Sequence, residues 1–142
     1  MTPSDMPDGS GADRFWARPG EAGLPPAVAP FSQGVRVGQL VFTAGQASID
    51  SEANVVGVGD IAAQTEQTLR NLSVVLERCG ASIGDVVKMT IWIRDMGDYA
   101  GMNEVYARWF EPPEPVRACV RSELVFPELL VEMEAVAVVG GH

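Results

Sequence analysis

Residues 116–121, VRACVR, place two arginines and a cysteine at alternate positions of a short stretch. Because successive side chains of a β-strand point to opposite faces, Arg117, Cys119 and Arg121 would share one face. A guanidinium binds a carboxylate through two hydrogen bonds and keeps its charge when it is partly desolvated. The stretch therefore predicts a strand whose polar face is either solvated or part of a site for a small organic acid.

A second alternating stretch, residues 129–139, places Glu132 and Glu134 on one face. Strands that follow one another usually pair, so we expect the two final strands to be neighbours, with Arg117 and Glu132 on the same uncovered face. Two interpretations remain open. The pair is an ion pair that holds subunits together, or Arg117 anchors a substrate carboxylate while Glu132 holds and deprotonates a water molecule.

Cys119 is a candidate nucleophile, but the only histidine, His142, is the last residue, so only arginines could lower the pKa of the thiol. We therefore expect Cys119 to take part in catalysis through its small side chain and the backbone groups beside the anchor. Arg121 is interpreted as a rim charge paired with a nearby acid. Without a histidine or cysteine cluster we expect no serine–histidine–aspartate chemistry, no metal and no cofactor.

The composition of the chain limits the partners that it can bind. The 142 residues are 46% hydrophobic and 20% charged, which is typical of one globular domain, and the formal net charge is −9. Such an acidic chain is a poor ligand for nucleic acid. No apolar run approaches the ~20 residues of a membrane-spanning helix, so we expect a cytoplasmic protein without a membrane partner.

The hydrophobic pattern predicts an N-terminal tail over residues 1–24 and one domain over residues 25–142. Two strands are expected within 33–46, a helix over 61–79 with Asp60 as its N-cap, a strand over 85–94 and a helix over 98–110. The two final strands complete a β-β-α-β-α-β-β order, which is an α+β fold. Two helices can cover only one face of such a sheet, so we expect the other face to be buried against copies of the same chain.

Several motifs together resemble the YjgF/RidA family, small reactive-intermediate deaminases formerly described as endoribonuclease L-PSP. They extend over residues 29–139 and comprise APFSQGVRVGQLVFTAGQ, QT-x-x-x-L-x-N, D-V-V-K, N-x-V-Y, P-x-R-x-C-V and E-x-E-A-x-A. The resemblance implies a chorismate-mutase-like α+β fold and a homotrimer, with the sheets as an inner barrel, the helices outside and the sites in clefts between subunits. It also implies cofactor-free hydrolysis of enamine or imine acids, such as 2-aminoacrylate, to a 2-oxo acid and ammonia.

The resemblance assigns roles residue by residue. Arg117 matches the family's carboxylate-binding arginine, Glu132 the acid that orients the attacking water, and Cys119 the neighbouring cysteine. Gly45 and Asn103 match segments that line the cleft.

Two positions depart from the family pattern, because Phe31 replaces a tyrosine and Ala44 replaces a serine. Each lost hydrogen bond to a charged group is worth about 1.5–3 kcal/mol, and the two changes also make the pocket drier and slightly roomier.

Four functions follow from these observations. The leading hypothesis is a hydrolytic deaminase of 2-aminoacrylate or 2-iminopropanoate type. The changes at Phe31 and Ala44 favour, as an alternative, a pathway-specialised member that acts on a larger or more apolar imine or enamine acid. A non-catalytic trimer that binds small carboxylates is a third hypothesis. A ribonuclease comes last, because the chain is acidic and offers no histidine or lysine pair.

Overall fold

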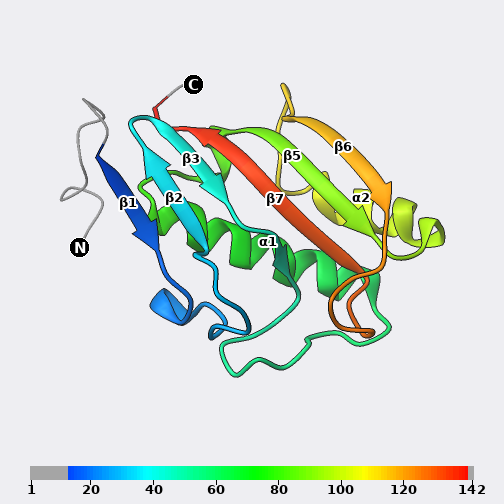
Figure 1. The fold of residues 1–142 in the computed structure, drawn as a ribbon. Helices are drawn as coiled ribbons and strands as arrows, with labels where there is room; N and C mark the ends of the chain where they lie inside the picture. The colour runs from blue at the N-terminus through cyan, green and yellow to red at the C-terminus, as the bar shows by residue number, and fades with distance from the viewer. Residues whose placement is uncertain (1–12, 141–142) are drawn as a thin grey trace.

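Both helices lie on one face of a single mixed β-sheet (Figure 1). The computed structural model describes residues 13–140. The strands are β1 (Arg14–Ala17), β2 (Gly34–Val37), β3 (Leu40–Thr43), β4 (Gln46–Ala47), β5 (Val86–Ile93), β6 (Val116–Arg121) and β7 (Val131–Val138), and the helices are α1 (Ile61–Arg78) and α2 (Tyr99–Tyr106). This architecture confirms the predicted α+β class.

The long helix α1 forms where the sequence predicts it. The side chain of Asp60 caps its first turn by accepting a hydrogen bond of 3.0 Å from the Ala63 amide. Its apolar stripe is fully buried against the sheet, as at Leu69, Leu72 and Leu76. Ala62, which the predicted stripe included, is exposed. The amphipathic pattern therefore positions the helix, whose first turn exposes Ala62 but contacts the core through Ile61 and buries Gln64.

Two buried polar side chains of α1 connect the helix to loops on the far side of the core. The amide nitrogen of Asn71 donates to the carbonyls of Ala47 and Ile49, at 3.0 and 2.8 Å. Gln64 donates to the Glu128 carbonyl at 2.9 Å and accepts from the Leu130 amide at 2.8 Å. Because buried backbone groups need partners, these bonds fix the loop backbone on both sides of the candidate site described below.

The order of strands differs from the sequence-based prediction. The sheet runs β1-β2-β3-β7-β5-β6, so the parallel neighbour of β6 is β5, and β7 lies on the other side of β5. The prediction that the two final strands pair directly is therefore wrong. The connection after β6 carries the chain past β5, which places β7 in the centre of the sheet, between β5 and β3.

The ladder between β7 and the strands β3 and β4 contains one extra residue. Phe42 pairs with Val136, whereas Gln46 pairs with Met133. The three residues 43–45 therefore lie opposite the two residues 134 and 135 of β7. The Thr43 hydroxyl accepts a 3.0 Å hydrogen bond from the Ala135 amide at this irregularity. Such bulges bend a strand and redirect its side chains, and this one brings residues 44 and 45 toward β7.

The N-terminal segment is more ordered than expected. Residues 14–17 form the edge strand β1, which pairs with β2, and Leu24 is buried. For residues 13–24 the prediction of a flexible tail is thus wrong, because apolar side chains such as Phe15 pack against the core. The part of that prediction on residues 1–12, like His142, lies outside the described residues.

On the face of the sheet away from the helices, several apolar side chains are exposed to solvent. One cross-strand row joins Trp16, Val35, Phe42, Val136, Lys88 and Val116. Trp16, Phe42 and Val116 are 51%, 42% and 68% exposed in the single chain. Exposed apolar surfaces of this kind are typical of interaction sites, and the packing of further copies of the chain on this face stays a prediction.

Candidate functional site

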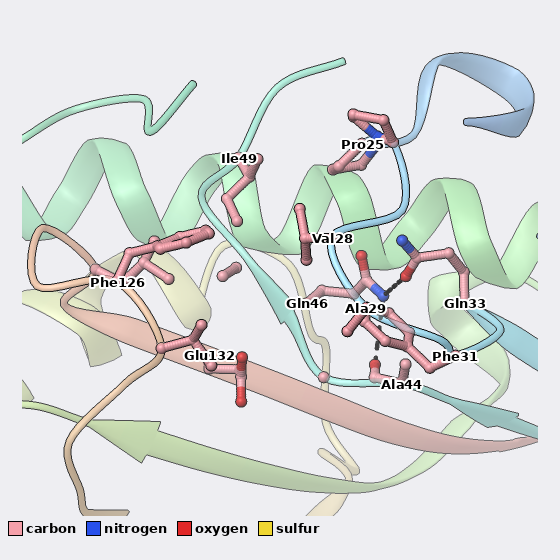
Figure 2. A pocket seen from close by; sticks show the side chains of 15 residues that line it. Pro25, Val28, Ala29, Phe31, Gln33, Ala44, Gln46, Ile49, Phe126 and Glu132 are labelled. Atoms are coloured by element: carbon pink, nitrogen blue, oxygen red, sulfur yellow. Dashed lines mark hydrogen bonds between the residues drawn. The ribbon is translucent and has the colours of Figure 1, made fainter. Parts of the chain in front are cut away.

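A pocket of about 370 Å³ opens beside β7, and Glu132 forms part of its wall (Figure 2). Three chain segments supply the rest of the lining, namely residues within 25–33, 44–49 and 125–129. Phe31 and Gly45, two of the residues predicted from the sequence, lie in this lining together with Glu132. We call this cavity the Glu132 pocket.

The bulge between β3 and β4 brings the backbone close to the carboxylate. A β-carbon built on Gly45 would lie 3.0 Å from both the carboxyl carbon and the Oε2 atom of Glu132. That distance is shorter than ordinary van der Waals contact, so glycine leaves the space that the carboxylate occupies. Because Gly45 has no side chain, the Glu132 carboxylate can lie directly against the backbone at this position.

The carboxylate of Glu132 is half-buried, and no hydrogen-bond donor from the described part of the chain reaches it. Burial raises the pKa of Glu132 above its ordinary value, and the nearby negative charge of Glu134 raises it further. A carboxylate with a raised pKa accepts protons more readily. Glu132 is thus suited to hold and deprotonate a water molecule.

The other polar side chains of the pocket are bonded to one another. Gln46 donates to the side-chain oxygen of Gln33 at 2.7 Å and to the Ala44 carbonyl at 3.4 Å (Figure 2). Both glutamines are buried. This pairing holds the loop at residue 33 against the bulge and leaves Glu132 as the charged group of the wall.

Arg117 lies on the opposite face of the sheet from Glu132. Its partners across the ladder are Met89 and then Ala135, which are both buried on the helix side. Glu132 instead pairs with Trp92 and alternates with the buried Met133. The prediction that Arg117 and Glu132 project from the same face is therefore wrong. The alternation of residue types along β6 predicts which side chains share a face, but it does not predict which of the two faces the helices cover.

Helix α2 surrounds the guanidinium of Arg117 with neutral groups. One terminal nitrogen donates to the Asn103 side-chain oxygen at 2.7 Å and to the Tyr99 hydroxyl at 2.9 Å. The guanidinium carbon also lies 4.8 Å from the centre of the Tyr106 ring. Within residues 13–140 no carboxylate forms an ion pair with Arg117. We call these four residues the Arg117 cluster, whose positive charge is free to receive an anion.

Cys119 follows Arg117 on the same face and packs against the core. Burial raises the pKa of its thiol, although the charge of Arg117 acts in the opposite direction. The thiol therefore stays protonated at neutral pH, which does not suit a nucleophile and fits the supporting role predicted for it. Arg121, at the end of β6, is exposed.

Sequence reasoning brought Asn103 into the site but missed Tyr99 and Tyr106. Positions 99, 103 and 106 follow one another at spacings of four and three, so the three side chains lie on one face of α2. That spacing was the available signal. The apolar wall formed by Val28, Ile49 and Phe126 was also missed, because these residues lie in loops without periodicity.

Among the described residues, histidine, cysteine and acidic side chains do not gather in a group of three or more that could ligate a metal ion. No helix in the described range has the length and apolar character needed to cross a membrane.

The fold and these two groups of residues define a class of small α+β proteins with an acidic pocket on one sheet face and an arginine cluster on the other. The family model described as Endoribonuclease L-PSP matches residues 22–139. The chain therefore belongs to this family, also called YjgF/RidA, as the sequence motifs predicted.

Two curated relatives and one solved structure illustrate the family. The 3-aminoacrylate deaminase RutC of Acinetobacter baylyi is 38% identical over 81% of this chain and 91% of its own length. The 2-iminobutanoate/2-iminopropanoate deaminase of Salmonella typhimurium is 35% identical over 80% and 91%. The crystal structure of Escherichia coli TdcF with bound serine superposes with a TM-score of 0.77 at 33% identity, covering 87% of this chain and 98% of that one.

Proposed function

We propose that this protein is a hydrolytic deaminase that converts 2-imino or enamine carboxylic acids to 2-oxo acids and ammonia. The observation that carries the proposal is the unpartnered Glu132 carboxylate, whose pKa is raised in an apolar pocket. Deaminases among the relatives act on substrates of this class, as their names state.

The reaction needs a carboxylate anchor and a water activator in one cleft. In a single chain, Arg117 and Glu132 lie on opposite faces of the sheet, so neither can serve a substrate held by the other. A closed homotrimer would bring the Arg117 cluster of one subunit against the Glu132 pocket of the next, with the exposed apolar face of each sheet buried inside the assembly. The site is thus shared between two subunits.

The proposed chemistry proceeds in ordinary proton-transfer steps. An enamine substrate first takes a proton on its β-carbon and loses one from its nitrogen, which gives the imine. Glu132 then accepts a proton from a water molecule while the water oxygen bonds to the imine carbon and the imine nitrogen takes up a proton. In the resulting carbinolamine, the amino group takes up the proton that Glu132 holds, the carbon–nitrogen bond breaks and ammonia leaves. The hydroxyl group loses its proton to solvent as the 2-oxo acid forms.

The side chains around Arg117 orient its guanidinium for binding the substrate carboxylate. Asn103 and Tyr99 hold one edge of the guanidinium, which leaves other N–H groups for the substrate carboxylate. The aromatic ring of Tyr106 restricts the position of the charge. Cys119 and its backbone groups lie next to this anchor, two residues along β6.

The test is ammonia and oxo-acid release from enzymatically generated 2-imino acids by wild type, Arg117→Ala and Glu132→Ala. We expect each substitution to lower kcat/KM about 100-fold or more, since a charge-assisted contact or the proton acceptor is lost. Arg108→Ala, which removes an exposed arginine paired with Glu104, is the matched control and should retain activity. Equal rates in all four proteins would overturn the proposal, and oxo-acid binding without turnover would support a carboxylate-binding protein instead.

A further inference from the structure

The Glu132 pocket is larger and more apolar than a three-carbon substrate requires. Its volume of about 370 Å³ lies in the range of pockets for sizeable ligands. A cavity of about 150 Å³ already accommodates benzene. The substrate 2-aminoacrylate has a single methylene carbon as its side chain and would leave most of this space empty.

The wall opposite the carboxylate is built from apolar side chains of three separate segments. Val28 and Phe31 come from the loop before β2, Ile49 from the segment after β4, and Phe126 from the loop between β6 and β7. In Figure 2 these side chains surround the space into which Glu132 extends. The paired Gln33 and Gln46 supply the polar groups at its edge.

This wall is held in place by the core of the protein. Leu129, which also lines the pocket, is 1% exposed, and the backbone on either side of it is bonded to Gln64 of α1. The segment that carries Ile49 is held by Asn71. These bonds fix the sides of the pocket that carry Ile49 and Leu129, whereas Val28 and Phe31 come from a loop in which they are 51% and 38% exposed.

We propose that the Glu132 pocket receives the side chain of the substrate and that the enzyme therefore prefers 2-imino acids with a branched aliphatic or aromatic side chain over 2-iminopropanoate. The inference rests on the proposed deaminase function and adds the class of substrate. Each methylene group buried in a hydrophobic pocket improves discrimination about 10-fold or more. Val28, Phe31, Ile49 and Phe126 are then the residues that determine specificity.

The experiment compares three imines in one assay. A D-amino-acid oxidase converts D-alanine, D-leucine and D-phenylalanine to their 2-imino acids, and the deaminase is measured by its acceleration of oxo-acid formation. For wild type we expect kcat/KM for the leucine- or phenylalanine-derived imine to exceed that for 2-iminopropanoate roughly 10-fold or more.

Two substitutions that fill the pocket make the comparison specific. Val28→Phe and Ala29→Phe add bulk to the same exposed loop, which tolerates a larger side chain without disturbing the core. Each should reduce the preference for the larger imine about 10-fold. Val58→Phe, the same change at an exposed position outside this pocket, should leave the preference as in wild type.

The outcomes separate this inference from the proposal beneath it. If wild type accelerates hydrolysis of 2-iminopropanoate as well as or better than that of the larger imines, the inference is wrong and the deaminase function stands. If the filled variants keep the wild-type preference, the pocket does not hold the side chain and the inference is again wrong. If no imine of any size is hydrolysed faster, the deaminase function itself fails.

Discussion

At the scale of single residues, the most informative side chain is Glu132, because its environment determines its protonation. Burial is the larger cause of its raised pKa, and the charge of Glu134 is the smaller one. A general base acts in its deprotonated form, so activity should fall as the pH drops through this raised pKa. The acidic limb of the kcat/KM profile is therefore expected above the ordinary range of a glutamate.

The variant Glu134→Gln tests this assignment. Removal of the second negative charge lowers the pKa of Glu132 part of the way, since burial remains, so the acidic limb should move to lower pH. The measurement is kcat/KM against pH. Glu77→Gln, which makes the same charge change at an exposed position on α1, should not move the limb. An unmoved limb in Glu134→Gln would show that another group controls it.

Residues 31 and 44 show how far a sequence pattern can be read. The family tyrosine and serine are phenylalanine and alanine here, and the structure places both Phe31 and Ala44 in the lining of the Glu132 pocket. The loss of two hydroxyl groups leaves Gln33 and Gln46 as the polar pair of that wall. Both departures therefore lie in the lining of the candidate site, which a motif alone could not establish.

At the scale of elements, helix α1 both buries the core and holds the site. The side-chain amide of Asn71 donates to two loop carbonyls, those of Ala47 and Ile49, and the Ala47 carbonyl also accepts from the Ile49 amide at 2.9 Å. In Asn71→Ala both carbonyls lose this donor while they remain largely buried. An unsatisfied buried group costs about 1–3 kcal/mol.

We expect Asn71→Ala to lower the free energy of unfolding by about 2 kcal/mol, measured by urea denaturation, and to reduce activity as the pocket wall loosens. Arg70→Ala is the control one residue away on the same helix. Arg70 forms an ion pair with Glu66 on the protein surface. Such pairs contribute little to the free energy of unfolding, so the stability of this variant should change little. Alanine has a higher helix propensity than either residue that it replaces, so a similar loss in both variants would indicate a general effect of shortening side chains on this helix and would contradict the role of the loop contact.

The elements also show what the sequence could and could not predict. The Asp60 cap, the buried stripe of α1 and the alternation of β7 follow from local patterns, and the structure confirms them. The order of the strands does not follow from local patterns, since β6 pairs in parallel with β5 although β7 is next in sequence. The face on which Arg117 lies depends on that order and on α2, which explains why the predicted neighbourhood of Arg117 and Glu132 was wrong.

At the scale of the whole molecule, the separation of Arg117 and Glu132 yields a test by mixing. In the proposed trimer each cleft combines the arginine of one subunit with the glutamate of the next. Arg117→Ala and Glu132→Ala are each inactive alone, but every mixed trimer contains one cleft with both residues intact. Equal mixing by co-refolding should restore about a quarter of wild-type activity, because most trimers are then mixed.

Mixing Arg117→Ala with the double variant Arg117→Ala/Glu132→Ala is the control, since no intact cleft can form. Native mass spectrometry establishes that subunits have exchanged. Exchange without recovery of activity would place both residues of a working site within one chain and would contradict the shared cleft.

The extra residue between β3 and β4 has a consequence for how this chain can evolve. Most loops tolerate insertions and deletions. Here the loss of one residue between Thr43 and Gln46 would restore a regular ladder with Gln46 still opposite Met133, and it would remove the bulge that brings Gly45 against the Glu132 carboxylate. Substitutions such as the alanine at position 44 leave the ladder intact. We therefore expect this segment to tolerate changes of side chain better than changes of length, so that the pocket can be altered by substitution while the number of residues stays fixed.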